Sequence, residues 1–131
     1  MLGNDIVDFS IDEKKYNNQR FIKRIMSPLE RLYLNKSNDK NAFLWTLWAA
    51  KEAAYKAYQK QNLTAIFSPV KFQISENTLL KIVEADFSDS VKGVLNYVAK
   101  KGTLIPVEII WPTRACVHCI YSFDFNNQQG A

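Results

Sequence analysis

The sequence predicts an α+β domain in which helices pack on an antiparallel sheet. The chain has 131 residues, the size of one globular domain, and 47% of them are hydrophobic, which is enough to fill a core. Residues 42–59 are good helix formers without Gly or Pro, whereas short alternating segments near both ends favour strands. No internal linker is visible. We therefore expect a single domain over residues 1–125 and a disordered tail at residues 126–131.

The first half is expected to contain a strand and then helices. Residues 2–9 favour a short strand that carries acidic side chains, and residues 12–25 a polar, basic helix or irregular segment. Residues 27–30 (SPLE) combine a capping serine, a proline and a glutamate three residues after the cap, which is a helix start. That helix should end near Lys36, where turn-forming residues begin.

The second half is expected to contain two strands, a helix and a closing hairpin. These elements are assigned, in order, to residues 70–74, 79–84, 88–101, 104–110 and 115–123. Turn-forming residues separate the segments, and Gly102 is expected to provide the C-terminal stop of the helix.

Composition and motifs exclude several function classes. The longest apolar run, residues 42–50, is shorter than the roughly 20 residues of a membrane span, and the acidic N-terminal segment is unlike a secretory signal. We therefore expect a cytoplasmic protein without a membrane partner. Cys116 and Cys119 flank His118 in a strand pattern, but no further ligand cluster accompanies them, so two structural cysteines are the simpler interpretation. Phosphate-loop, nucleophile and RNA-binding motifs are missing, so we expect no nucleic-acid partner.

The net charge of +4 is concentrated in one region. Between residues 14 and 36 the only acidic residue is Glu30, and seven residues are basic: Lys14, Lys15, Arg20, Lys23, Arg24, Arg31 and Lys36. Such a patch is usually a solvated face. Where it is functional, its partner is an anion, such as nucleic acid, phosphate or an acidic protein surface.

Asp5, Glu52 and Lys56 are the candidate chemical residues. Glu52 and Lys56 are four residues apart on one helix face, where a surface ion pair is the simplest interpretation. Trp45 and Trp48, however, place Glu52 beside aromatic surface, where a carboxylate needs a cation or a metal. Asp5 is likewise disfavoured inside an apolar strand unless it has a use. Two carboxylates and a lysine suit a divalent cation that holds a diphosphate, with Asp5 and Glu52 as metal ligands and Lys56 on phosphate oxygens.

Three motifs resemble those of the 4′-phosphopantetheinyl transferases, and in particular of the small holo-[acyl-carrier-protein] synthases. Residues 3–8 (GNDIVD) resemble the opening signature of the family, and residues 48–57 (WAAKEAAYKA) its second signature, (W/F)xxKEAxxKA. Between them, residues 20–26 (RFIKRIM), followed by Glu30, are similar to the RFxxRIL…E segment of the small class. The motifs occur in the order found in the family.

The resemblance implies the fold and the reaction of that family. The reaction is Mg²⁺-dependent transfer of the 4′-phosphopantetheine group from coenzyme A to a serine of an apo carrier protein, with release of adenosine 3′,5′-bisphosphate. Carried over by motif position, Asp5 and Glu52 are expected to bind Mg²⁺. Glu52 and Lys56 are the expected catalytic residues, and Lys51 and Lys56 the expected coenzyme A ligands. These roles agree with phosphoryl transfer, which requires mainly positioning and charge neutralisation.

The resemblance also implies partners. Carrier proteins are typically acidic, so Arg20, Lys23 and Arg24 are expected to dock one. Small synthases assemble as trimers with the active site at the subunit boundary, so we expect a homo-oligomer, with a trimer as the implied form.

The chain departs from the family pattern on the side that holds the nucleotide of coenzyme A. Leu47 stands where an arginine usually precedes the second signature, and Ile11 where a basic residue follows the first. Residues 58–60 replace a glycine turn, and residues 106–111 lack the histidine of an HVSxSH-like segment. The alternative function is therefore a catalytically weak or inactive family member that acts as a carrier-protein-binding module.

Overall fold

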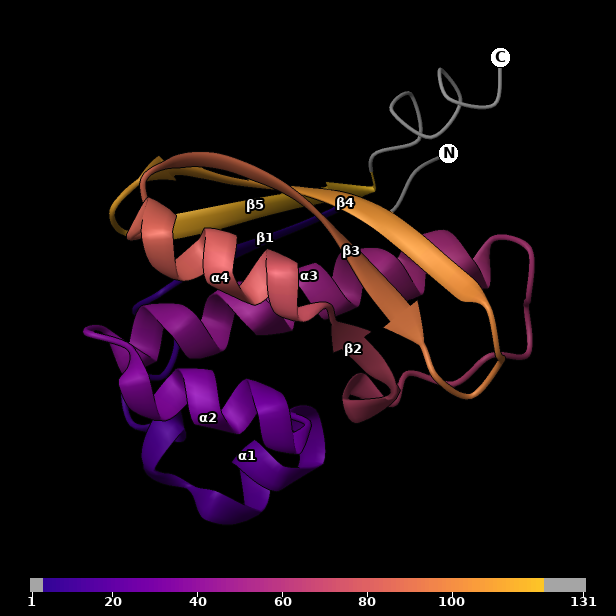
Figure 1. The fold of residues 1–131 in the computed structure, drawn as a ribbon, viewed down its shortest axis with the longest axis horizontal. Helices are drawn as coiled ribbons and strands as arrows, with labels where there is room; N and C mark the ends of the chain where they lie inside the picture. The colour runs from indigo at the N-terminus through magenta and orange to yellow at the C-terminus, as the bar shows by residue number, and fades with distance from the viewer. Residues whose placement is uncertain (1–3, 122–131) are drawn as a thin grey trace.

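The computed structural model describes residues 4–121, which form a five-stranded antiparallel sheet with helices against one face (Figure 1). The strand order is β1-β5-β4-β3-β2, and the predicted α+β class is confirmed. The strands are β1 (Asn4–Asp8), β2 (Phe72–Ile74), β3 (Asp89–Tyr97), β4 (Thr103–Thr113) and β5 (Cys116–Tyr121). The helices are α1 (Gln19–Ile25), α2 (Pro28–Lys36), α3 (Lys40–Gln59) and α4 (Glu76–Ala85), with short 3-10 helices η1 (Lys15–Asn17) and η2 (Pro69–Lys71).

Helix α3 is the centre of the molecule and packs against β1, β4 and β5. The side chain of Asp39 caps it by accepting a hydrogen bond from the Ala42 amide at 3.0 Å. Most residues of its first four turns are buried, and Trp111 Nε1 of β4 donates to Thr46 Oγ1 at 3.1 Å within the core. This bond fixes how the helix lies on the sheet. None of the helices formed by residues 4–121 is both long and apolar enough to cross a membrane.

Strand β1 lies at one edge of the sheet and pairs only with β5 among the described strands. Asp5 and Val7 face the helices and Ile6 faces outward, as the alternation predicts. Residues 2 and 3 of the predicted strand lie outside the described part of the chain. The strand therefore presents a carboxylate to α3.

The helices that precede α3 form a further layer beneath it (Figure 1). The predicted start of α2 is confirmed as a capping box, in which Ser27 Oγ accepts from the Glu30 amide and Glu30 Oε1 from the Ser27 amide. The segment expected at residues 12–25 is divided into η1 and α1. Asn18 separates them, because its side chain caps α1 by accepting from the Phe21 amide.

The strand expected at residues 79–84 is wrong, because this segment belongs to α4. Ser75 Oγ accepts a hydrogen bond from the Thr78 amide at 3.2 Å and caps a helix where a turn between strands was expected. Leu79 and Ile82, one helical turn apart, are both fully buried. The apolar residues of this segment recur with the helical period, but the segment is too short for that period to be distinguished from a strand by sequence alone.

The helix expected at residues 88–101 is also wrong, because most of this segment is β3. Val91, Gly93 and Leu95 alternate toward the inner face, and α4 crosses the strand at Gly93, where any Cβ would collide with the Thr78 side chain. Gly102 is not a helix stop. It lies in the β3–β4 turn with a φ of 81°, a conformation that favours glycine.

The closing hairpin is confirmed, but its turn is shorter than predicted. Strand β4 continues through Trp111 to Thr113, and a register irregularity between Ile110 and Thr113 precedes the turn. Residues 122 and 123 of the predicted strand, and the expected tail at residues 126–131, lie outside the described residues.

The outer face of the sheet carries apolar side chains that no described helix covers (Figure 1). Ile6, His118 and Ile110 form one row across β1, β5 and β4. Ile6 is 65% exposed, as is Leu104 at the start of β4.

Candidate functional site

Strand β1 and helix α3 bring Asp5, Glu52 and Lys56 together. Lys56 Nζ donates to Asp5 Oδ1 at 3.2 Å and to the Asn4 carbonyl oxygen at 3.0 Å. Asp5 is 12% exposed at its side chain, whereas Lys56 is 44% exposed and lies at the rim of the site. The structure therefore joins the two halves of the predicted constellation, which are separated by almost 50 residues of sequence.

Glu52 is a half-buried carboxylate with an elevated pKa. Burial is the main cause, and the negative charge of Asp5 adds to it. The charge of Lys56 and a hydrogen bond from the Trp48 side chain act in the opposite direction without cancelling the effect. Two carboxylates thus share a partly dry site that holds one lysine, and a further cation there would relieve their repulsion.

The Asp5 carboxylate is incompletely satisfied. Its Oδ1 accepts from Lys56, whereas its buried Oδ2 has no partner among the described residues while Glu52 is ionised. A hydrogen bond between the Asp5 and Glu52 carboxyl groups needs a proton, and it also raises the pKa of Glu52. Carboxylate oxygens are the ligands that hard divalent cations prefer, so the donor set fits Mg²⁺. Within residues 4–121 no group of three or more His, Cys, Asp and Glu side chains is placed to hold a metal. Among residues 4–121 the site therefore offers two carboxylates, Asp5 and Glu52, as candidate ligands.

Cys119 and His118 take no visible part in this site. Cys119 lies opposite Asp5 in the β1–β5 ladder, and complete burial together with the Asp5 charge raises the pKa of its thiol well above the usual value. His118 points to the other face, where its Nε2 lies 2.6 Å from Asn4 Oδ1. Both cysteines are free thiols.

Lys51 does not lie where a coenzyme A ligand is needed. Its side chain is completely buried, and its Nζ donates to Glu30 Oε1 at 2.8 Å, to the Phe72 carbonyl at 2.7 Å and to the Pro69 carbonyl at 3.1 Å. All three donor positions of the ammonium group are therefore used within the protein. The interpretation of Lys51 as a substrate ligand is corrected to a structural role, since burial directs it away from Glu52 and Lys56.

Glu30, which the sequence analysis identified as part of a helix start and of a family motif, has a further structural role in the core. Its Oε1 accepts from the Ser27 amide and from Lys51, and its Oε2 accepts from the Ile74 amide at 2.8 Å. The carboxylate therefore joins α2, α3 and β2 in the core. The motif formed by residues 20–26 and the following glutamate was the only sequence signal for this role of Glu30. The motif does not indicate that Lys51 is the residue with which Glu30 pairs.

Aromatic side chains border Glu52 on the α1 side, as expected. The Trp48 ring packs on Phe21 with centroids 6.1 Å apart and on Phe67 at 5.5 Å. Trp45 is buried and donates from Nε1 to the Asp12 carbonyl oxygen at 3.1 Å. These rings exclude water from one side of the carboxylate.

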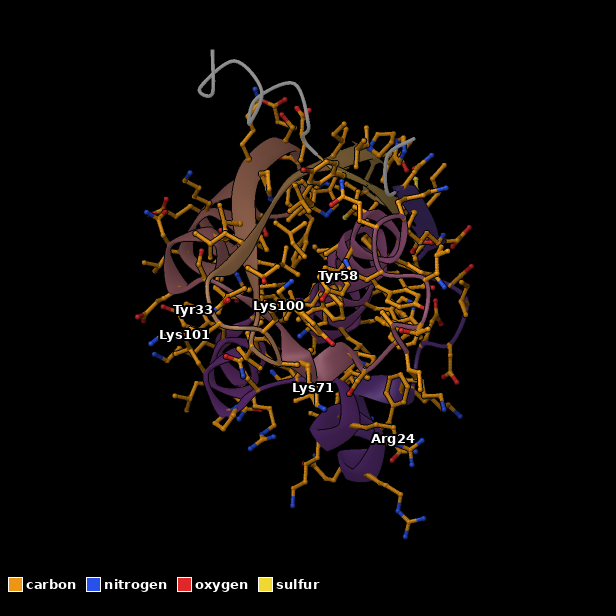
Figure 2. The ribbon with its side chains drawn as sticks, turned by 90° about the vertical axis from the view of Figure 1, so that its right-hand side faces the viewer. Arg24, Tyr33, Tyr58, Lys71, Lys100 and Lys101 are labelled. Atoms are coloured by element: carbon orange, nitrogen blue, oxygen red, sulfur yellow. The ribbon has the colours of Figure 1, made fainter. Side chains whose placement is uncertain are left out.

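Arg20, Lys23 and Arg24 are all exposed and lie on one face of α1, at spacings of three and four residues. Figure 2 shows Arg24 at the helical end of the molecule, away from the β3–β4 turn that carries Lys100 and Lys101. The structure therefore groups the three predicted docking residues on one accessible surface.

The two largest departures from the family pattern have structural consequences. Leu47 is fully buried, so position 47 faces the core and not the site. Residues 106–111 lie in β4, where Val107, Ile109 and Trp111 fill the core. The inward-facing side chains at both positions are therefore apolar, and Glu108, the charged residue of segment 106–111, is only partly buried.

Comparisons with known proteins agree with these motifs. The ACPS family model, described as the 4′-phosphopantetheinyl transferase superfamily, matches residues 1–97. The fold is similar to that of holo-[acyl-carrier-protein] synthase from Neisseria meningitidis, with a TM-score of 0.57, 21% identity, and coverage of 92% of this chain and 96% of that one. It is also similar to the apo-ACPS structure from Chronobacterium ammoiniagenes, with a TM-score of 0.52, 15% identity, and coverage of 92% and 94%. No curated protein matches the sequence significantly.

Proposed function

This chain belongs to the 4′-phosphopantetheinyl transferase superfamily, and from that premise we propose a specific reaction for it. The substrate is coenzyme A, and the acceptor is a serine hydroxyl of an apo acyl carrier protein. The products are the holo carrier protein and adenosine 3′,5′-bisphosphate. We place the reaction in the cytoplasm.

The observation that carries the proposal is the buried, unpartnered Oδ2 of Asp5 beside the half-buried Glu52. Leaving a charged oxygen without a partner is costly, so a site retains one mainly where a ligand completes it. Asp5 and Glu52 would hold Mg²⁺, which when bound neutralises charge on the diphosphate of coenzyme A.

The residues of the site can perform the remaining steps. Lys56, at the exposed rim, contacts the diphosphate oxygens and neutralises the negative charge that develops on the leaving nucleotide. The serine oxygen bonds to the phosphorus that carries the pantetheine arm, and the bond from that phosphorus to the bridging oxygen breaks. Glu52, beside the reacting phosphate, accepts the serine proton as the general base.

Two partners complete the proposal. The face of α1 that carries Arg20, Lys23 and Arg24 docks the acidic carrier protein. The outer face of the sheet, where the exposed Ile6 lies in a row with the partly buried His118 and Ile110, supports a homo-oligomer, with a trimer as the proposed form. Light scattering coupled to size exclusion measures the oligomeric state.

An intact-mass assay tests the reaction. Purified protein, coenzyme A and Mg²⁺ are incubated with a panel of apo carrier proteins, and one carrier should gain the mass of one phosphopantetheine. Glu52→Gln and Lys56→Ala should each lower kcat/KM by at least about 100-fold, because each removes a group that acts on the reacting atoms. Glu84→Gln on α4 and Lys71→Ala in η2 are matched controls at exposed positions and should retain full activity.

The alternative is a carrier-binding module without transferase activity, and one observation favours it. Leu47 is buried where the family usually has an arginine, and segment 106–111 has no histidine and turns Val107, Ile109 and Trp111 toward the core. Such a module should bind apo carrier protein but show no Mg²⁺-dependent binding of coenzyme A. If no carrier in the panel is modified while a known transferase modifies all of them, the transferase proposal is wrong.

A further inference from the structure

The ion pair between Lys56 and Asp5 joins a long side chain at the rim of the site to a short one that is held in the sheet. Asp5 lies in β1, opposite Cys119 of β5, and is 12% exposed at its side chain. Lys56 is 44% exposed, and a flexible four-carbon stem carries its ammonium group to 3.2 Å from Asp5 Oδ1. Lys56 can therefore leave the pair without a change in the fold, whereas Asp5 is fixed by its strand.

The charge of Lys56 serves both carboxylates of the site. It pairs with Asp5, and it also reaches Glu52, which lies one helical turn earlier on the same face of α3. Burial and the charge of Asp5 raise the pKa of Glu52, and the charge of Lys56 acts against them. A hard divalent cation needs the same two carboxylates as ligands. Lysine and the cation therefore compete for Asp5, because two positive groups repel each other at such short range.

The bonds of Lys56 differ from those of the structural lysine, Lys51. Lys51 has no exposed side-chain surface and donates hydrogen bonds to three protein acceptors. Among residues 4–121, Lys56 donates to two acceptors, Asp5 Oδ1 and the Asn4 carbonyl oxygen. An ammonium group has three donors, so Lys56 keeps one for a ligand that reaches the exposed rim.

We propose that Lys56 makes metal binding depend on the diphosphate. The lysine pairs with Asp5 until a diphosphate offers its ammonium group a better acceptor, and only then leaves Asp5 and Glu52 to a divalent cation. This inference rests on the proposed function, because the diphosphate is that of coenzyme A. Phosphate oxygens form strong, charge-assisted hydrogen bonds with ammonium groups. Since the coupling between two ligands is reciprocal, the cation and coenzyme A each strengthen the binding of the other.

Titrations of the full-length protein with Mn²⁺ test the inference. Mn²⁺ prefers the same oxygen ligands as Mg²⁺, and its paramagnetic resonance signal distinguishes the free ion from the bound ion. At about pH 8, where protons compete little for carboxylates, the wild type should bind Mn²⁺ alone weakly. Lys56→Met, which keeps the length of the side chain without its charge, should bind Mn²⁺ alone at least about tenfold more tightly. With saturating coenzyme A the two proteins should bind Mn²⁺ with similar affinity, so the gain that coenzyme A brings should be larger in the wild type by the same factor.

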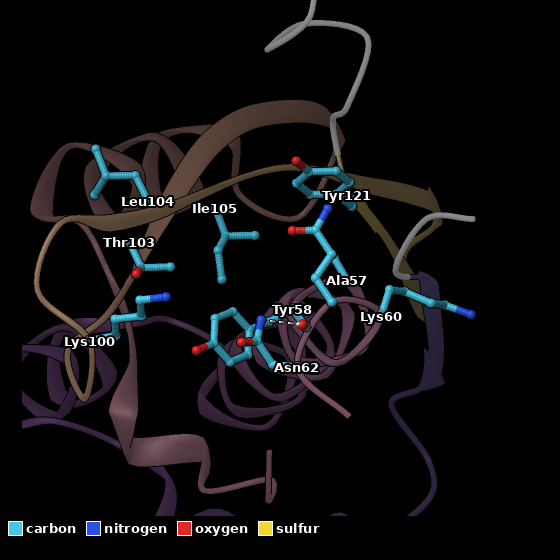
Figure 3. A pocket seen from close by; sticks show the side chains of 10 residues that line it. Ala57, Tyr58, Lys60, Asn62, Lys100, Thr103, Leu104, Ile105 and Tyr121 are labelled. Carbon is cyan, nitrogen blue, oxygen red and sulfur yellow. Dashed lines mark hydrogen bonds between the residues drawn. The ribbon is translucent and has the colours of Figure 1, made fainter. Parts of the chain in front are cut away.

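Three variants control for charge and for folding. Lys60 is an exposed lysine one turn after Lys56 that lines a cavity of about 520 Å³ at the C-terminal end of α3, and its side chain is directed away from Tyr58 and Tyr121 (Figure 3). Lys60→Met removes the same charge at the end of the same helix and should bind Mn²⁺ as the wild type does. Lys56→Arg retains the charge and should also bind Mn²⁺ alone weakly. Lys56→Gln, a second neutral variant, should bind it as tightly as Lys56→Met.

The outcomes separate this inference from the transferase proposal. Equal affinity of the wild type and Lys56→Met for Mn²⁺ alone, or an equal gain on adding coenzyme A, would overturn the inference. Tighter binding of Mn²⁺ by Lys60→Met to the same extent would also overturn it, because it would show a long-range effect of net charge. If carrier proteins are modified but Lys56→Met binds Mn²⁺ no more tightly than the wild type, the transferase proposal stands and the inference fails. If no carrier is modified but metal binding depends on Lys56 and coenzyme A as expected, the lysine controls a metal site in a protein without transferase activity.

Discussion

Lys51 and Glu30 form an ion pair of 2.8 Å in which neither side chain is exposed to solvent. Lys51 directly precedes Glu52 on α3, and Glu30 connects α2 to β2 through the Ile74 amide. The pair therefore fixes the helix that carries the candidate catalytic residues against the rest of the core. Burial alone lowers the pKa of Lys51 and the charge of Glu30 only partly offsets this, so the lysine depends on its partner to stay charged.

Lys51→Met should destabilise the protein by about 3–5 kcal/mol, because it leaves the Glu30 charge buried without its partner while keeping side-chain volume. Urea unfolding followed by circular dichroism measures the change, with exposed Lys71→Ala as a control expected within about 0.5 kcal/mol of wild type. Adding Glu30→Gln to Lys51→Met should recover part of the loss, since it removes the unpaired charge. If the double variant is as unstable as the sum of the single variants, the pair is not coupled.

The raised pKa of Glu52 should make the unliganded protein lose stability as pH rises. In the unfolded chain Glu52 titrates near its ordinary value of 4.5, whereas in the folded protein it holds its proton to higher pH. Its contribution to stability is therefore complete below the ordinary value and is lost as pH rises through the folded-state pKa. Glu52→Gln should remove this decline.

Thermal unfolding of wild type and Glu52→Gln from about pH 4 to about pH 8 measures the effect. As the pH rises, the free energy of unfolding of the wild type should fall relative to that of Glu52→Gln. The other titrating groups are common to both proteins, so they do not contribute to this change. A difference that is constant over this range would show that Glu52 is not perturbed.

The basic face of α1 should control the encounter with the carrier protein. Charge reversal in a triple variant, Arg20→Glu, Lys23→Glu and Arg24→Glu, should raise KM for the carrier by at least about tenfold with little change in kcat. The wild-type rate should fall as salt is added, and the variant should lose this dependence. Arg114→Glu in the β4–β5 turn is the control and should behave like wild type. Salt-independent rates in the wild-type protein would contradict the docking surface.

Gly93→Ala should destabilise the protein by roughly 1–3 kcal/mol, because its new methyl group would collide with Thr78 where α4 crosses β3. Thr78 Oγ1 also accepts a hydrogen bond from the Val94 amide at 3.0 Å, so Thr78→Ala has a cost of its own. Since Thr78→Ala makes room for the methyl group, the double variant should be less unstable than the sum of the two single variants. Additive effects in chemical denaturation would show that the contact is not the cause.

Helices α2 and α3 could be predicted from the sequence because the signals that define them are local. A capping serine and proline define the start of α2, and an uninterrupted run of helix formers defines α3. The segments after residue 75 could not be assigned in this way. Residues 79–84 are helical because Ser75 caps the helix that contains them. Strand β3 forms by pairing with β4, whose residues lie farther along the chain.

The residues of the candidate site also differ in how far the sequence predicts their positions. Asp5, Glu52 and Lys56 are found together because their motifs specify them, and the structure agrees in their placement. Lys51 was misinterpreted because its burial is set by Glu30, 21 residues earlier. The cavity at the end of α3 had no signal in the sequence, since its lining comes from several elements separated along the chain.

The position of Trp48 provides an optical probe of the candidate site. Trp45 and Trp111 are buried and have hydrogen-bond partners within the protein, whereas Trp48 is half-buried and contacts Glu52. Changes in the charge state or occupancy of the carboxylates therefore act on one indole, while the other two provide a steady background emission. Ligand titrations can be followed by intrinsic fluorescence, without any label that would disturb so small a protein.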